Sequence, residues 1–138
     1  MTARPLLVVD GANVVGSVPD GWWRDRRGAA ERLRDALVPV AGDGLPPESG
    51  APDRFVGVAL EVVLVVEGAA RGVAPLLPAV RVAATAGSGD DLIVDLAARA
   101  RAADADRPIL VVTADRELRR RVGAVGASSI GPRAVPRG

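Results

Sequence analysis

Short apolar runs alternate with segments of helical periodicity along this chain, and the pattern predicts an α/β fold. The apolar runs are rich in Val and Leu, and each is followed within two residues by an acid or a glycine. Such runs are typical of strands buried on both faces of a parallel sheet. We expect strands at residues 5–9, 58–66, 80–85 and 108–113.

Three segments between or after these runs carry apolar residues at helical spacing. In residues 22–37 the apolar positions recur at spacings of seven, three and four, and most of the arginines fall elsewhere. A second helix is expected to open at 86–91, where acids suit the helix dipole, and a third to follow Asp115 and end near Gly123. Since strands and helices alternate, we expect a doubly wound, mostly parallel sheet of four to five strands.

Two segments lack the periodicity of a helix or a strand. Residues 39–54 are rich in Pro, Gly and acids, which predicts a flexible loop within one domain. Residues 131–138 repeat Gly, Pro and Arg and are expected to form a disordered tail. The chain of 138 residues is therefore predicted to contain a single domain at 1–130.

The acids that follow the strands are expected to gather at one edge of the sheet. The carboxyl ends of parallel strands lie at the same edge, and this is where open α/β sheets bind ligands. Asp95, one helical turn after Asp91, is expected to support this group from behind. The acids assigned to the carboxyl edge are Asp10, Glu67, Asp90, Asp91 and Asp115.

The residue types that are missing exclude several kinds of chemistry. The sequence has no Lys, His or Cys, so all 18 basic residues are Arg. This excludes Ser-His and Cys-His nucleophile pairs, ordinary zinc sites and lysine-containing phosphate loops, and it argues against a phosphotransfer receiver. Carboxylates gathered without Lys or His repel one another unless a cation lies among them. Oxygen ligands favour Mg²⁺ or Mn²⁺ as that cation.

Carboxylates that bind Mg²⁺ or Mn²⁺ suit phosphodiester hydrolysis, in which the ion activates water and stabilises charge on the phosphate. Asn13 is expected to hydrogen-bond a carboxylate or a phosphate oxygen, and Thr113 to orient Asp115 or a water. Each residue also fits a structural role, because Asp90 and Asp115 can cap helices, Asp10 can begin a turn and Thr favours strands. The convergence of several acids favours the chemical interpretation.

Three stretches resemble, in order, the motifs of NYN domains of the YacP-like branch, within the PIN-like nuclease superfamily. They are residues 8–14 (VVDGANV), 89–93 (GDDLI) and 111–116 (VVTADR). The resemblance covers most of the chain, and three linked motifs are more specific than any one of them. The sequence departs from the family's pattern at Ala12, where an aromatic residue is usual, and at 39–54, which has no recognised counterpart.

The resemblance implies a metal-dependent endoribonuclease with a three-layer, Rossmann-like (PIN-like) fold. The residues that match the family's acidic and polar positions are expected to be catalytic or to bind Mg²⁺ or Mn²⁺. The catalytic residues are predicted to be Asp10, Asn13, Asp90, Thr113 and Asp115. The metal ligands are predicted to be Asp10, Asp90, Asp91 and Asp115, of which Asp91 matches a frequent second acid.

The expected substrate is single-stranded RNA, held by arginines near the acids and by one tryptophan. One of two adjacent helical residues usually faces the core, so Trp23 is assigned to packing and Trp22 to stacking on an unpaired base. The net charge is only +1, and most arginines suit solvated helix faces. The predicted substrate-binding residues are Trp22, Arg24, Arg27 and Arg116.

Two other functions remain open from the sequence. The same fold could bind RNA or a protein without cleaving it, or could be a PIN-like toxin ribonuclease controlled by a partner. No apolar run approaches the roughly 20 residues of a membrane span, and the residues before Asp10 are too few for an export signal, so a cytoplasmic protein is expected. A homodimer, a protein partner and a ribosome that presents the RNA stay open as alternatives.

Overall fold

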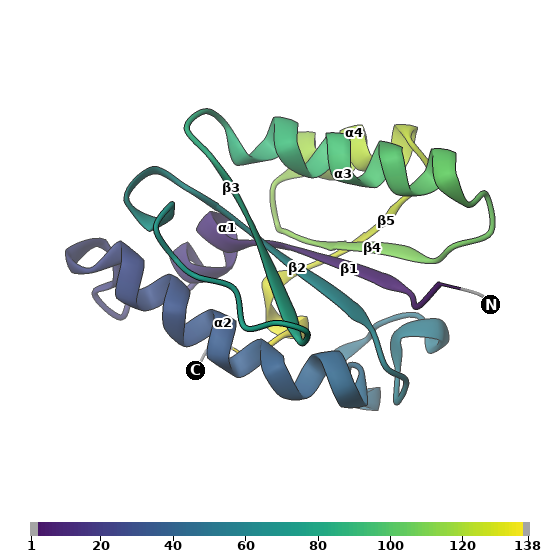
Figure 1. Ribbon diagram of the computed structural model, residues 1–138, viewed down its shortest axis with the longest axis horizontal. Coiled ribbons are helices and arrows are strands. Elements are labelled where there is room, and N and C mark those ends of the chain that lie inside the picture. Colours follow the sequence, from purple (N-terminus) through teal and green to yellow (C-terminus); the bar gives the residue numbers. More distant parts are fainter. Residues whose placement is uncertain (1–2, 137–138) are drawn as a thin grey trace.

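Strand β1 (Leu6–Asp10) is the middle strand of a five-stranded sheet in which all strands are parallel (Figure 1). The structure is a computed structural model that describes residues 3–136. The other strands are β2 (Glu61–Glu67), β3 (Val80–Thr85), β4 (Ile109–Val112) and β5 (Ser128–Ile130). The order across the sheet is β3-β2-β1-β4-β5, so the chain extends the sheet first to one side of β1 and then to the other.

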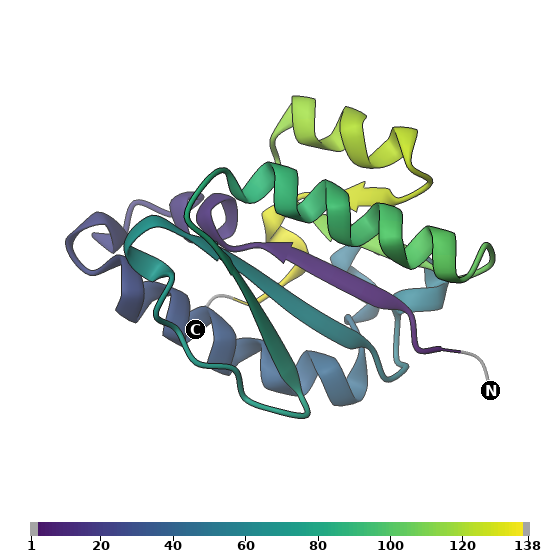
Figure 2. The ribbon, with the colours of Figure 1, turned by 45° about the horizontal axis from the view of Figure 1, so that its top comes forward.

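Helices cover both faces of the sheet and make a three-layer fold (Figure 2). The helices are α1 (Gly11–Gly16), α2 (Arg26–Asp43), α3 (Gly89–Ala103) and α4 (Arg116–Ala124). Short 3-10 turns are η1 (Trp22–Arg24), η2 (Pro47–Ser49), η3 (Asp53–Phe55), η4 (Gly68–Ala70) and η5 (Pro132–Ala134). Helix α2 lies on one face, and α3 and α4 lie on the other (Figure 1). The predicted α/β fold with a parallel sheet is confirmed.

Alternate residues of the central strands point to opposite faces, and each face has its own aliphatic core. The core against α2 includes Leu7, Val9, Leu33, Leu37, Leu64 and Val112. The core against α3 and α4 includes Leu6, Val8, Ile93, Val111, Leu118 and Val122. Burial on both faces explains why the central strands are continuous apolar runs rather than alternating ones.

The segment 39–54, predicted to be a flexible loop, is part of the packed fold. Pro39 lies inside α2 on its exposed side, and the next residue, Val40, is buried in the core. Packing of this helical turn therefore outweighs the backbone hydrogen bond that proline cannot make. Leu45, before η2, and Phe55, the last residue of η3, are also buried, so this segment forms helix, 3-10 turns and core contacts in place of the predicted loop.

The helix predicted at 22–37 begins later than expected. Asp25 is its N-cap, and the Asp25 side chain accepts a hydrogen bond from the backbone N–H of Gly28 at 2.9 Å. Asp is among the preferred residues at this position because its carboxylate satisfies a free N–H of the first turn. Trp22 and Trp23 consequently lie in the separate turn η1.

The disordered tail predicted at 131–138 is wrong for residues 131–136. These residues form η5 and the segment after it, and Ala134 and Val135 are only 4% and 5% exposed. Val135 packs in the core that faces α2, and this burial of apolar surface orders the segment. Residues 137–138 lie outside the described part of the chain.

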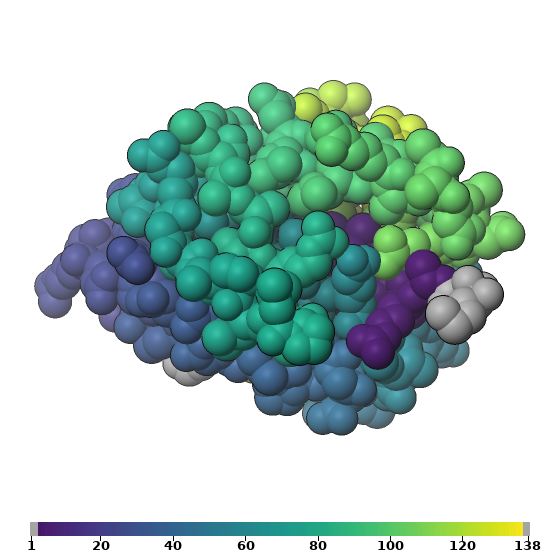
Figure 3. Space-filling model, in the orientation of Figure 1, coloured from purple at the N-terminus to yellow at the C-terminus, as the bar shows by residue number. Residues whose placement is uncertain are grey.

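Strands β3 and β5 form the two edges of the sheet. In the space-filling view, the teal segment that contains β3 covers the middle of the visible face (Figure 3).

No helix within residues 3–136 is both long and apolar enough to cross a membrane.

Candidate functional site

Four carboxylates from four separate segments line one open hollow at the carboxyl edge of the sheet. The hollow has a volume of about 260 Å³. We call it the acidic hollow, and its lining residues are Asp10, Ala12, Asn13, Glu67, Asp90 and Asp115. Asp10 and Glu67 end β1 and β2, whereas Asp90 and Asp115 stand at the starts of α3 and α4. The predicted gathering of acids at this edge is therefore observed for these four residues.

Asp10 is the most buried acid of the hollow, with 6% of its surface exposed. Val9 pairs with Val112 in the sheet, so the next residues of the two strands, Asp10 and Thr113, come together. Thr113 Oγ1 donates a hydrogen bond to Asp10 Oδ2 at 2.8 Å, and the backbone N–H of Asn13 donates to Oδ1 at 3.3 Å. Both carboxylate oxygens are thus held in fixed directions.

Burial raises the pKa of Asp10 above its ordinary value, because the charged form loses water. The hydrogen bonds from Thr113 and from the Asn13 backbone lower the pKa, and the negative charges of Asp90 and Glu67 raise it. The net direction is upward. The fold therefore holds an ionised Asp10 at a cost in stability, which a cation in the hollow would relieve.

Asn13 and Thr113 tie the loops of the hollow to each other. Asn13 Oδ1 accepts a hydrogen bond from the backbone N–H of Ala114 at 2.9 Å, which joins α1 to the loop after β4. Thr113 is fully buried, and its Oγ1 also accepts from the backbone N–H of Asp115 at 3.2 Å. Both residues position the acids, and Asn13 also lines the hollow.

Glu67 belongs to the hollow although the sequence-based list of metal ligands omits it. Its Oε2 accepts a hydrogen bond from the backbone N–H of Gly89 at 2.5 Å, which links the end of β2 to the start of α3. A Cβ at Gly89 would stand 2.6 Å from this oxygen, and a Cβ at Gly11 would stand 2.5 Å from the carbonyl oxygen of Val65. Gly11 is therefore required for the close approach of the β2 backbone, whereas a Cβ at Gly89 would displace the Glu67 carboxylate. The signal available in the sequence was that Glu67 ends a buried strand, as Asp10 does.

Asp90 and Asp115 face the hollow from the first turns of two helices. Desolvation raises the pKa of Asp90, and the charges of Asp115 and Glu67 raise it further, while Arg121 acts in the opposite direction. Asp115 Oδ1 caps α4 by accepting from the backbone N–H of Leu118 at 2.8 Å. The capping role and a place in the hollow are thus compatible for the same side chain.

Two predicted acids do not face the hollow. Asp91 points outward, where its side chain is 75% exposed and pairs with Arg121 at 2.8 Å. Adjacent helical residues differ by about 100° in direction, so Asp90 and Asp91 cannot both face the same hollow. Asp95, expected behind the acids, pairs instead with Arg99 at 3.0 Å on the helix surface. Asp91, predicted as a metal ligand, therefore does not line the hollow.

None of the predicted substrate-binding residues lines the hollow. Arg116 is exposed directly after Asp115. Arg24 lies over the Trp23 ring at 5.8 Å, and Arg27 pairs with Glu31 at 3.9 Å.

Trp23 does not have the placement expected of it, whereas Trp22 lies beside the acidic hollow. Trp23, assigned to packing, is 52% exposed, because η1 rather than a regular helix carries it. Trp22 is half-buried and lines a cavity beside the acidic hollow. Arg26, which is not among the predicted substrate-binding residues, lines the same cavity.

The donor chemistry of the acidic hollow fits a hard divalent cation, but its side chains are spread around an opening. No group of three or more acids within residues 3–136 stands close enough to hold a metal ion directly. Mg²⁺ in proteins usually keeps several waters and binds through one or two carboxylates. The hollow therefore fits a hydrated ion better than a tight protein cage, and no arginine lies among its lining residues to take the place of that ion.

The parallel sheet with helices on both faces and the acid-lined carboxyl edge define a three-layer α/β protein with a candidate site at that edge. The structure is similar to that of Rae1 (YacP) from Bacillus subtilis, with a TM-score of 0.65 and 19% identity over 94% of this chain and 70% of that one. A mutant of the same protein gives a TM-score of 0.65 and 18% identity over 94% of this chain and 71% of that one. No protein-family model matches the sequence, and no curated protein sequence matches it either. The predicted likeness to the YacP-like branch is thus confirmed as a likeness of fold.

Proposed function

We propose that the chain is a metal-dependent endoribonuclease that hydrolyses phosphodiester bonds of single-stranded RNA at the acidic hollow. One observation carries the proposal: Asp10, Glu67, Asp90 and Asp115 reach the same hollow from four separate segments. Carboxylates that raise one another's pKa are a costly arrangement unless a cation uses them. The fold shared with Rae1 and the NYN-type motifs support the same conclusion.

A hydrated Mg²⁺ or Mn²⁺ ion would lie among Asp10, Glu67, Asp90 and Asp115, bound through one or two of these carboxylates and through its own waters to the others. When bound, such an ion supplies an activated water and stabilises the negative charge on the phosphate during attack. Asp91 has no part in this set, since its side chain points outward and pairs with Arg121.

The protein's own residues fix the geometry around the ion. Thr113 and the Asn13 backbone hold the two oxygens of Asp10, and Asn13 Oδ1 holds the loop that carries Asp115. In hydrolysis a water oxygen joins phosphorus and one P–O bond of the RNA breaks, so no covalent protein intermediate is needed. This suits a chain with no His, Cys or Lys.

RNA cleavage with added metal tests the proposal. A single-stranded RNA labelled at both ends is incubated with Mn²⁺, and internal products are followed by gel. We expect Asp10→Asn and Asp115→Asn to lower the rate by at least about 100-fold, since removal of a group in the reaction centre typically costs this much or more. Asp91→Asn is the matched control and should keep its rate within about threefold, because Asp91 faces solvent.

A non-catalytic RNA-binding module is the second candidate function. The spacing of the acids favours this function, because no three acids within residues 3–136 stand close enough together to coordinate one metal ion. Binding of the RNA with no internal products at any Mn²⁺ concentration would support this module and contradict the nuclease. Cleavage that is unchanged in both the Asp10 and Asp115 variants would also contradict the nuclease site.

A further inference from the structure

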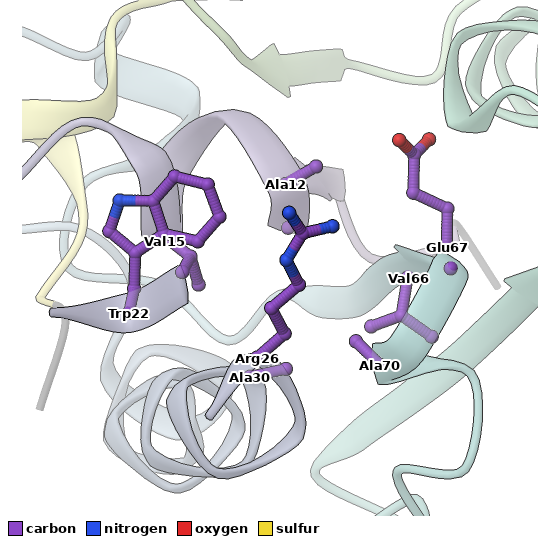
Figure 4. Close-up of a pocket in the computed structure, with 10 residues that line it drawn as sticks. Ala12, Val15, Trp22, Arg26, Ala30, Val66, Glu67 and Ala70 are labelled. Carbon is purple, nitrogen blue, oxygen red and sulfur yellow. The ribbon is translucent and has the colours of Figure 1, made fainter. Parts of the chain in front are cut away.

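A second cavity opens directly beside the acidic hollow. Its volume is about 90 Å³, and Ala12 and Glu67 belong to its lining and to that of the acidic hollow. Its apolar wall includes Val15, Ala30, Val66 and Ala70. Trp22 and Arg26 complete the lining from η1 and from the first turn of α2 (Figure 4). We call it the tryptophan cavity.

The polar and aromatic groups of the tryptophan cavity are placed for a flat ligand. Figure 4 shows the Arg26 side chain between the Trp22 indole and Glu67. The Arg26 guanidinium lies 5.4 Å from the Trp22 ring centroid and makes no ion pair or hydrogen bond with the described part of the chain. Its donors are therefore available to a ligand, whereas most other arginines near the site already have partners.

We propose that the tryptophan cavity receives one unpaired nucleobase of the RNA whose phosphate lies in the acidic hollow. This inference rests on the proposed function for the presence of RNA. The volume of about 90 Å³ is smaller than the roughly 150 Å³ of an apolar cavity that encloses benzene, so the tryptophan cavity takes one ring partly inserted and cannot enclose a whole base. Trp22 supplies a stacking face, and apolar side chains contact the inserted part of the ring.

The charge of Arg26 selects among the bases. A guanidinium has only donors, so it favours base edges that present carbonyl oxygens. Uracil combines two such oxygens with one ring, whereas adenine has two rings and an amino group in place of a carbonyl. We therefore assign the cavity to uracil in preference to adenine.

The shared wall links the base to the site of cleavage. Ala12, which is exposed and small, and Glu67 line both hollows, so the two hollows adjoin at these residues. A base in the tryptophan cavity thus places the adjoining phosphate at the carboxylates, and occupancy of the cavity would select which bond is cut.

Fluorescence of the tryptophans provides a binding test that needs no cleavage. The chain has two tryptophans, so Trp23→Phe leaves Trp22 as the single reporter. This variant is titrated without metal with a uridine trinucleotide, an adenosine trinucleotide and an abasic trinucleotide. We expect saturable quenching by uridine, at least about fivefold weaker binding of adenosine, and no quenching by the abasic chain, since base stacking accounts for a large share of such binding. Equal quenching by the abasic chain, or no quenching by any of the three, overturns the proposal.

Binding by variants, measured by calorimetry, gives an independent readout. Trp22→Leu should weaken uridine binding about tenfold or more, while Trp23→Leu should leave it unchanged. Arg26→Met should remove the preference for uridine over adenosine, with Arg32→Met, an exposed residue of the same helix, as its control. Arg26 is exposed, so this variant is expected to fold even if Trp22→Leu does not. If Arg26→Met still binds uridine more tightly than adenosine, the assignment of the cavity to uracil is contradicted.

The two proposals can fail separately. Base-selective quenching without RNA cleavage would support base binding in the tryptophan cavity and contradict the nuclease proposal. The opposite outcome is metal-dependent cleavage with the same sites and rates in wild type, Trp22→Leu and Arg26→Met. It would support the nuclease proposal and contradict base binding in the tryptophan cavity.

Discussion

Asp10 has both a structural and a chemical position in the fold. It ends the central strand, caps α1 through the Asn13 backbone, and receives the Thr113 hydroxyl. The burial that fixes the direction of the Asp10 carboxylate also disfavours its charged form. A residue whose native position opposes its own ionisation is typical of a functional site rather than of a helix cap alone.

The raised pKa of Asp10 predicts how stability depends on pH without metal. A group whose pKa is raised in the native state stabilises the fold fully below its unfolded pKa, and this contribution is lost as the pH rises through the native value. Asp10→Asn removes a charge that is unfavourable at pH 7. We expect the variant to melt at a higher temperature than wild type in EDTA at pH 7, and the difference to shrink as the pH falls toward 4. Differential scanning calorimetry measures both.

Asp91→Asn is the control for this experiment, because it removes only an exposed ion pair with Arg121 and should change the melting temperature little. Added Mn²⁺ should stabilise wild type and not Asp10→Asn. A variant less stable than wild type in EDTA at every pH would show that the Asp10 carboxylate is a structural group whose charge the fold favours.

Most of the acidic residues of the hollow could be predicted from sequence, because strand ends and helix starts have defined positions in a parallel sheet. Asp10, Asp90 and Asp115 follow this rule. The choice between Asp90 and Asp91 could not be predicted, since it depends on helix rotation and on Arg121, thirty residues away. Arg26 could not be singled out from the neighbouring arginines for a similar reason, because the helix was expected to start at residue 22 and η1 changes the direction of the side chains before it.

At the scale of elements, the strands were predicted better than the segments between them. The strand at Val80–Thr85 has the predicted bounds, and β4 differs by one residue at each end. The helical turn beyond Pro39 and the turn η5 were missed, because local preferences for Pro and Gly suggested loops. In both places the buried apolar residues Val40 and Val135 hold the segment, and their burial depends on partners far away in sequence.

Burial of Val135 predicts that the segment after β5 contributes to stability. Val135→Ala removes two methyl groups from the core that faces α2, so we expect the free energy of unfolding to fall by about 1–2 kcal/mol. Arg133→Ala, two residues earlier and exposed, is the control and should change it by less than about 0.5 kcal/mol. Urea denaturation measures both, and equal stability of the two variants would contradict the packing of this segment.

At the scale of the whole molecule, the strand order explains why four distant segments meet. The chain leaves β1 toward β2 and β3, then crosses to β4 and β5 on the other side. The carboxyl ends of β1 and β4 are therefore neighbours although about a hundred residues separate them. A sheet with this order creates a crevice beside its first strand, and the acidic hollow lies there.

Calorimetric titration of Mn²⁺ tests the central claim, that these carboxylates together form a divalent-cation site. We expect wild type and Asp91→Asn to bind with similar affinity, and Asp10→Asn and Asp90→Asn to bind at least about tenfold more weakly, because losing a ligand or its support typically costs this much. No measurable binding to wild type, or equal binding by wild type and Asp10→Asn, would contradict the account.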